Sequence, residues 1–102
     1  MRIITRKRLE LWKTRYPDAR AAIEAWAVKT EASNWHNITD VRQDFPNADG
    51  VIVSSGKTVT VFDIRWNRYR LVSAIHYNRG CVYAMRFLTH AEYDREKWKQ
   101  SL

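Results

Sequence analysis

The sequence predicts an α+β fold in which N-terminal helices and a C-terminal helix pack on an antiparallel β-sheet. Three observations support this prediction. Apolar residues recur at helical spacing through the first 45 residues, four β-rich runs separated by short turns follow from residue 49, and helical spacing returns after Leu88. A chain of 102 residues suits one domain with a single core, so we expect one domain over residues 1–102.

The first helix is expected after a short initial strand, MRII. In the segment TRKRLELWKTRY, Leu9, Trp12 and Tyr16 fall on one face of a helix, and Thr5 is a residue type that favours the N-cap. Pro17 then suits the first turn of a second helix, because the first helical position tolerates proline.

The second and third predicted helices each carry one inward face. In PDARAAIEAWAVKTEA, the inward positions are Ile23, Trp26 and Thr30. A shorter helix is expected between Trp35 and Phe45. Its signals are Asn37 as the cap, Ile38, Val41 and Phe45 as inward residues, and Pro46 as the terminator.

The β-rich runs lie near residues 51–53, 58–65, 69–77 and 81–88, and the turns between them are SSGK, RWN and NRG. Such short connections predict an antiparallel meander. The last two runs are apolar at odd and even positions alike, so we expect them centrally, under the helices, with the opposite face meeting solvent or a ligand. In HAEYDREKWKQSL, Tyr93, Lys97 and Trp98 are spaced for a final amphipathic helix.

The charge indicates a polyanionic partner. Eighteen Lys and Arg against eleven Asp and Glu give a formal net charge of +7 and a pI near 9.9. This excess favours nucleic acid, or an acidic protein that covers the same face, over a basic surface that is merely solvated. No apolar run approaches the roughly 20 residues of a membrane span, and the N-terminus lacks the apolar core of a signal peptide. A single cysteine, Cys81, fits a reducing cytoplasm and is expected to be a small buried residue.

Several kinds of site are not indicated by the sequence. The three histidines and one cysteine form no spaced ligand set, so we expect metal-independent behaviour and no cofactor. The three glycines stand in predicted turns, and no glycine-rich phosphate loop is present.

Arginine and aromatic residues are dense on the strands and their turns. The set comprises Lys57, Arg65, Trp66, Arg68, Tyr69, Arg70, Tyr77, Arg79, Tyr83 and Arg86. Guanidinium groups bind phosphates in bidentate fashion, and aromatic faces stack on unpaired bases, so the set favours single-stranded RNA. The alternative is that the aromatic residues brace a hairpin while the arginines are solvated.

The segment LTHAEYD combines a helix start with candidate catalytic groups. Thr89 and Glu92 have the spacing of a capping box, which needs no functional explanation. His90 and Tyr93 fall on one face of the new helix, and Asp94 is placed to orient the His90 ring. Taken alone, the pair fits structural packing as well as catalysis.

The motifs NADGV, VFDIRWNRYRLVSAIHYNRG and LTHAEYDREKWK, in that order, resemble the HigB toxins of bacterial HigBA toxin-antitoxin modules, within the RelE/ParE-like superfamily. With ITDVRQDFPNAD the similarity covers almost the whole chain. The resemblance implies a RelE-like fold and an mRNA interferase that cuts messenger RNA, often in the ribosomal A site, and is silenced by a HigA-type antitoxin. The chemistry it implies is metal-free attack of a ribose 2′-hydroxyl on the adjacent phosphate.

The resemblance also suggests roles for individual residues. Arg70 in NRYRL matches the strand arginine expected to stabilise the phosphate. His90 is the expected acid or base, because histidine ordinarily titrates nearest to neutrality. Tyr93 is expected to orient the ribose, stack on a base or relay a proton, with Asp94 supporting. The expected RNA-contacting residues are Lys57, Arg65, Arg68, Arg79 and Lys97.

Two positions depart from the family pattern. Met85 stands where a basic residue is usual, and Arg86 follows one position later, so only a bulge or an altered register brings Arg86 to the site. Trp66 replaces a small residue at a hairpin turn, which suggests different packing there or a partner contact. Two other functions stay open: a ParE-like toxin that acts on DNA gyrase without nuclease chemistry, and a passive RNA-binding module.

Overall fold

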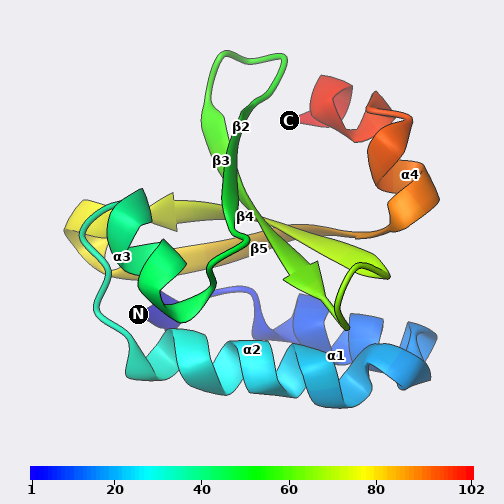
Figure 1. The fold of residues 1–102 in the computed structure, drawn as a ribbon, viewed down its shortest axis with the longest axis horizontal. Helices are drawn as coiled ribbons and strands as arrows, with labels where there is room; N and C mark the ends of the chain where they lie inside the picture. Colours follow the sequence, from blue (N-terminus) through cyan, green and yellow to red (C-terminus); the bar gives the residue numbers. More distant parts are fainter.

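A five-stranded sheet in the order β1-β5-β4-β3-β2 forms the middle of the molecule, in a computed structural model that describes residues 1–102 (Figure 1). The strands are β1 Arg2–Ile3, β2 Asp49–Ile52, β3 Thr58–Ile64, β4 Tyr69–His76 and β5 Cys81–Thr89. The predicted meander from β2 to β5 is confirmed, since each consecutive pair is antiparallel. The short first strand pairs with β5 in parallel and makes the sheet mixed at that edge.

Two helices lie along one face of this sheet (Figure 1). They are α1, Arg6–Arg15, and α2, Arg20–Ala32, joined by the 3-10 turn Pro17–Ala19. Leu9, Ile23 and Trp26 are buried on the predicted inward faces. Thr5 is the N-cap residue of α1, as predicted, but its hydroxyl makes no capping hydrogen bond and instead accepts the Ala84 amide of β5 at 2.7 Å.

The third helix, α3, spans Ile38–Asp44 and ends before Pro46, as predicted. Asn37 caps it by accepting the Asp40 amide at 3.0 Å. Behind α3, the ring of Phe62 in β3 meets Phe45 at 5.0 Å and Trp26 at 5.5 Å between ring centroids. These aromatic contacts bury Phe62 and fix the helical layer onto the sheet.

The C-terminal segment differs from the single helix predicted for it. Helix α4 covers only His90–Asp94, and a 3-10 helix, Lys97–Ser101, follows. The break falls at Glu96, whose φ of 61° is left-handed and incompatible with a continuing right-handed helix. Trp98 is nevertheless buried against valines of β3 and β4.

This segment packs on the sheet face opposite α1 and α2. Val61 joins the cluster around Trp98, whereas its neighbour Phe62 joins the helical core, so the two clusters lie on opposite faces of β3. The face predicted to meet solvent or a ligand is therefore partly covered by the chain's own C-terminus. None of the helices is both long enough and apolar enough to cross a bilayer.

The β3–β4 hairpin is tied to the helical layer through one carboxylate, Asp18. Its oxygens accept the Tyr69 hydroxyl at 2.8 and 3.0 Å, and it pairs with Arg65 and, at 3.8 Å, with Arg68. The Tyr69 hydrogen bond chiefly, and then Arg65, lower the pKa of Asp18 below its ordinary value of 3.8.

This lowered pKa predicts an acid-dependent loss of stability. Because the folded state favours the ionised carboxylate, Asp18 stabilises the fold above the unfolded pKa and this contribution is lost as pH falls through the folded pKa. We expect Asp18→Asn to be less stable at neutral pH and to lose less Tm than the parent between about pH 5 and pH 2. Thermal melts across that range check this, with Asp49→Asn, whose only ion pair is 3.7 Å long, as the control. Equal acid slopes for Asp18→Asn and the parent would contradict it.

Candidate active site

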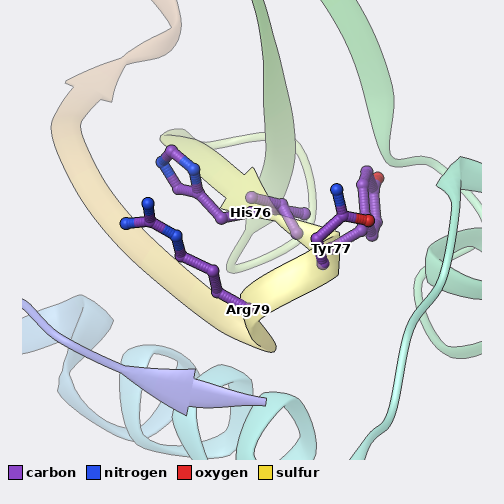
Figure 2. A pocket seen from close by; sticks show the side chains of 5 residues that line it. His76, Tyr77 and Arg79 are labelled. Atoms are coloured by element: carbon purple, nitrogen blue, oxygen red, sulfur yellow. The ribbon is translucent and has the colours of Figure 1, made fainter.

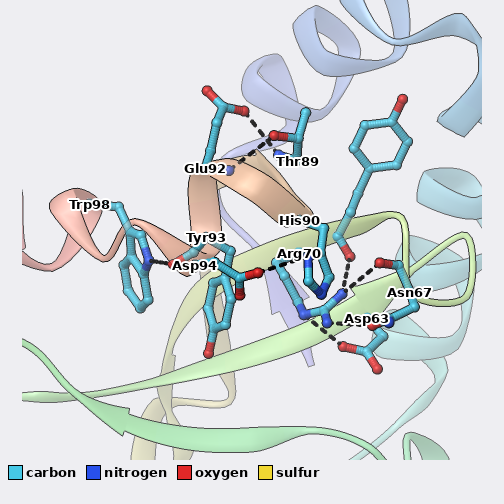
Figure 3. A network of polar contacts seen from close by, with 10 residues as sticks. Asp63, Asn67, Arg70, Thr89, His90, Glu92, Tyr93, Asp94 and Trp98 are labelled. Atoms are coloured by element: carbon cyan, nitrogen blue, oxygen red, sulfur yellow. Dashed lines mark hydrogen bonds and ion pairs between the residues drawn. The ribbon is translucent and has the colours of Figure 1, made fainter.

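Helix α4 starts where β5 ends, and its start is fixed by the predicted capping box. The Thr89 hydroxyl accepts the Glu92 amide at 3.2 Å, and the Glu92 carboxylate accepts the Thr89 amide at 2.9 Å. The His90 amide donates to the Arg68 carbonyl of the β3–β4 hairpin at 3.1 Å. His90 is therefore held between the end of β5 and the hairpin tip (Figure 3).

His90 and Asp94 form a polar pair one helical turn apart. His90 Nδ1 lies 2.9 Å from Asp94 Oδ2, and both side chains are about half exposed, at 48% and 58%. The carboxylate fixes the orientation of the ring and leaves Nε2 as the nitrogen open to a ligand. This is the arrangement that a histidine needs for proton transfer to or from a bound group.

The ring of Tyr93 is covered on both faces. Trp98 stacks on it at 5.3 Å between centroids with an interplanar angle of 19°, and the Arg70 guanidinium lies 5.4 Å from the same ring centroid. Figure 3 shows these two groups on opposite sides of the ring. Of the three roles predicted for Tyr93, stacking on a base does not fit this geometry. Burial chiefly raises the pKa of Tyr93, so the hydroxyl stays protonated at neutral pH and is available as a hydrogen-bond donor.

Arg70 is enclosed by polar partners, and its side chain is only 12% exposed. Its Nε lies 3.1 Å from Asp63 Oδ1, and its Nη1 donates to the carbonyls of Asn67 and Tyr69 at 3.2 Å each. Its Nη2 donates to the Asn67 side-chain oxygen. Four of the five guanidinium N–H groups are thus engaged, and one remains for a ligand. In this state Arg70 braces the hairpin and Tyr93 together.

A β-bulge in β5 lies directly beside Arg86. The register between β4 and β5 passes from Val72 opposite Arg86 to Ser73 opposite Ala84, so Met85 is an extra residue in β5. Paired residues share a sheet face, so Arg86 lies on the face of Val72 and not of the helical core. The sequence left open whether a bulge or an altered register brings Arg86 to the site; a bulge is present at Met85, and Arg86 itself lies in the regular part of the β4–β5 pairing.

Arg86 and Arg70 lie on the same face, because Arg86 pairs with Val72, and Arg70 and Val72 are two residues apart in β4. Arg86 donates to the Met85 carbonyl at 2.8 Å and to the Ser101 hydroxyl at 3.1 Å. It has no carboxylate partner, in contrast to Arg70, so its positive charge is not neutralised within the protein.

The predicted RNA-contacting residues are not gathered in one place. Lys57 lies in the β2–β3 turn and Lys97 begins the 3-10 helix that follows α4. Both are exposed and form no ion pair. Arg65 and Arg68 form ion pairs with Asp18 at the hairpin tip, and these pairs attach the hairpin to the helical layer.

Arg79 lies at the opposite end of β5 from His90. It lines a shallow hollow at the β4–β5 turn with Ile75, His76, Tyr77 and Asn78 (Figure 2). The nine residues of β5 separate this hollow from α4, roughly 30 Å at 3.3 Å per residue. Arg79 therefore cannot touch the same phosphate as His90.

Sequence reasoning missed the partners that hold Arg70. Asp63 stands directly opposite Arg70 across the hairpin. Their positions flanking the RWN turn, together with their opposite charges, are a signal for this pair. The hydrogen bond from Arg86 to Ser101 has no such signal, because it depends on how the C-terminal segment folds back. No group of three or more His, Cys, Asp or Glu side chains is arranged to hold a metal ion.

Comparison with known families supplies a match for most of the chain. A family model described as HigB_toxin, RelE-like toxic component of a toxin-antitoxin system, matches residues 19–96. The matched range includes the β-meander, the capping box and the residues of the His90 site, except Trp98, which stacks on Tyr93, and Ser101, which binds Arg86. A comparison with curated proteins returned no match.

Proposed function

The chain belongs to the HigB family of RelE-like toxins, and from that premise we propose that it is an mRNA endoribonuclease that acts without a metal. The observation that carries the proposal is His90, whose Nδ1 is held by Asp94 and whose Nε2 is open, on a helix whose Tyr93 ring packs against the guanidinium of Arg70. A ParE-like toxin that acts on gyrase without nuclease chemistry would not need this arrangement of side chains.

The proposed reaction is a transesterification within the RNA. The 2′-oxygen gives up its proton and bonds to the adjacent phosphorus, and the bond from phosphorus to the 5′-oxygen breaks. That oxygen takes a proton, so the products are a 2′,3′-cyclic phosphate and a 5′-hydroxyl end. His90 transfers one of the two protons, since its free nitrogen suits it for acid or base.

The remaining groups serve the phosphate and the ribose. The Tyr93 hydroxyl, kept protonated by its raised pKa, donates a hydrogen bond to the ribose or the phosphate. Arg86 supplies uncompensated positive charge on the same sheet face, and Arg70 contributes its one free N–H while positioning Tyr93. Asp94 positions His90.

The partners follow from the same proposal. A toxin of a toxin-antitoxin system implies a cognate antitoxin, here of the HigA type, which neutralises the toxin. The substrate is mRNA, engaged on the ribosome in the A site, in the cytoplasm. The net charge of +7 favours both an RNA substrate and docking on a ribosome, which is itself a polyanion.

Mapping of RNA 5′ ends after brief induction tests this function directly. We expect new 5′-hydroxyl ends within coding regions, appearing only while translation is active. If the ends also appear when translation is blocked, the enzyme cuts free RNA and the ribosomal part of the proposal is wrong. Intact message accompanied by DNA-damage signalling would favour a gyrase toxin, and RNA binding without any cleavage would favour a passive binding module.

A further inference from the structure

The tip of the β3–β4 hairpin carries an indole that contacts almost nothing. Trp66 is 93% exposed, whereas the other four tryptophans are buried or packed against a hydrophobic cluster. A side chain of this size normally hides its apolar surface, so its exposure requires a reason other than folding.

The backbone at this tip is held in an unfavourable conformation. Arg65 and Trp66 have φ values of 52° and 62°, so two successive non-glycine residues occupy the left-handed region. Both neighbours of Trp66 are fixed: Arg65 by Asp18, and Asn67 by Arg70. The hairpin therefore holds Trp66 rigidly outward, and glycine would fit the same backbone with less strain.

The tip lies close to the candidate active site. The carbonyl of Arg68, two residues after Trp66, accepts the His90 amide at 3.1 Å. Since two residues span at most about 7 Å, the backbone of Trp66 lies within roughly 12 Å of that of His90. A ligand at His90 that extends along the hairpin can therefore reach the indole.

The surroundings of Trp66 suit a nucleic-acid base better than a protein. The residues that line the hollows beside it, Asn47, Asp63, Arg65, Asn67 and Arg68, are all polar. A protein interface has an apolar core of several side chains, which a lone indole among polar groups does not provide. An unpaired base needs one flat aromatic face, polar groups at its edge and nearby positive charge.

We propose that Trp66 is a stacking platform for an unpaired RNA base next to the phosphate that is cleaved. This inference rests on the proposed nuclease function and adds a substrate-binding residue to it. The indole replaces the stacking that Tyr93 cannot supply, because both faces of the Tyr93 ring are covered.

Substitutions at Trp66 test the inference with a 2′-O-methyl RNA oligonucleotide, which the enzyme cannot cleave, in an anisotropy assay. Trp66→Ala is expected to weaken binding about 10-fold, and Trp66→Phe to keep most of it, because a phenyl ring also stacks. In cleavage assays on programmed ribosomes, Trp66→Ala should raise KM by a similar factor and leave kcat within about two-fold. Leu11→Ala, which removes an exposed apolar side chain of α1, is the matched control and should change neither value.

Trp66→Gly provides a second test, in which thermal stability and RNA binding are expected to change in opposite directions. Glycine relieves the left-handed strain and removes no buried contact, so Tm should rise by about 4 °C while RNA binding falls as in Trp66→Ala. A Tm below that of the parent would show that the indole supports the fold, and would overturn the inference.

The outcomes separate this inference from the proposed function. If Trp66→Ala binds and cuts RNA as the parent does, the platform is wrong and the nuclease stands. If that variant instead loses only antitoxin binding, the tip is a protein contact and the inference also fails. If the parent itself neither binds nor cuts RNA, the proposed function fails.

Discussion

Replacing His90 by alanine should abolish RNA cleavage while leaving the fold and RNA binding in place. His90 is half exposed, and its side chain pairs only with Asp94, so its removal leaves no cavity and no buried unpaired group. The loss of a proton-transfer group typically lowers the rate by about 10²- to 10⁴-fold. Single-turnover cleavage on programmed ribosomes, with anisotropy for binding and a thermal melt for stability, measures the three effects separately.

The chain contains a matched control for this experiment. His36 and Asp40 form the same i,i+4 pair, at 3.4 Å, beside α3, and the His36 side chain is also exposed. His36→Ala removes an identical group from a place with no proposed role, so its cleavage rate should equal that of the parent. Full cleavage by His90→Ala would refute the assignment of His90. Loss of binding as well as cleavage would show that His90 acts in RNA recognition.

Replacing Arg70 by alanine should reduce both cleavage and stability. The guanidinium joins Asp63, the hairpin and Tyr93, and its removal leaves the Asp63 carboxylate without its partner at a largely buried position. We expect cleavage to fall about 100-fold, as for other groups that stabilise a reacting phosphate or oxyanion. Since the pair is only partly exposed, a stability loss of about 2 kcal/mol is expected.

Two further variants separate the positioning role of Arg70 from its charge. Arg70→Lys keeps the charge but loses the planar fork that binds Asn67 and Asp63, so a positioning role predicts little rescue of cleavage. Asp63→Asn weakens the ion pair and keeps Arg70, so it should be less stable than the parent but still cut RNA. Cleavage by Arg70→Ala at the parent rate would remove Arg70 from the site.

The different roles proposed for Arg70 and Arg86 follow from the groups that each side chain contacts. The resemblance to HigB toxins points to Arg70 as the main phosphate-binding group, but a carboxylate already balances its charge. Arg86 has only neutral partners, the Met85 carbonyl and the Ser101 hydroxyl. A phosphate therefore meets more uncompensated charge at Arg86, provided that it displaces the contact with Ser101.

Much of the fold could be predicted because it depends on local signals. The β-meander follows from β-rich runs separated by short turns, and the capping box from a three-residue spacing. The candidate pair of His90 and Asp94 follows from helical spacing alone. These features depend on residues that are close together in the sequence, so they can be predicted without knowing which distant segments are in contact.

The failures concern residues whose neighbours come from elsewhere in the chain. Thr5 has the residue type of a helix cap, but an amide of β5 takes its hydroxyl instead. The helical spacing of the C-terminus runs on past Asp94, yet Glu96 turns left-handed and Trp98 packs against valines of β3 and β4. In both cases a long-range contact outweighs a local preference of about 1 kcal/mol.

The sequence by itself determined the order of helices and strands, the helix start that carries His90, the basic charge and the family. Only the tertiary structure decided which groups can act together at that helix start. The pairing of Arg86 with Val72 brings Arg86 to the face of Arg70, and Trp98 and Arg70 cover the two faces of the Tyr93 ring. The physical reason is that strand register and side-chain packing depend on contacts between segments that are distant in the chain. Local sequence patterns do not specify these contacts.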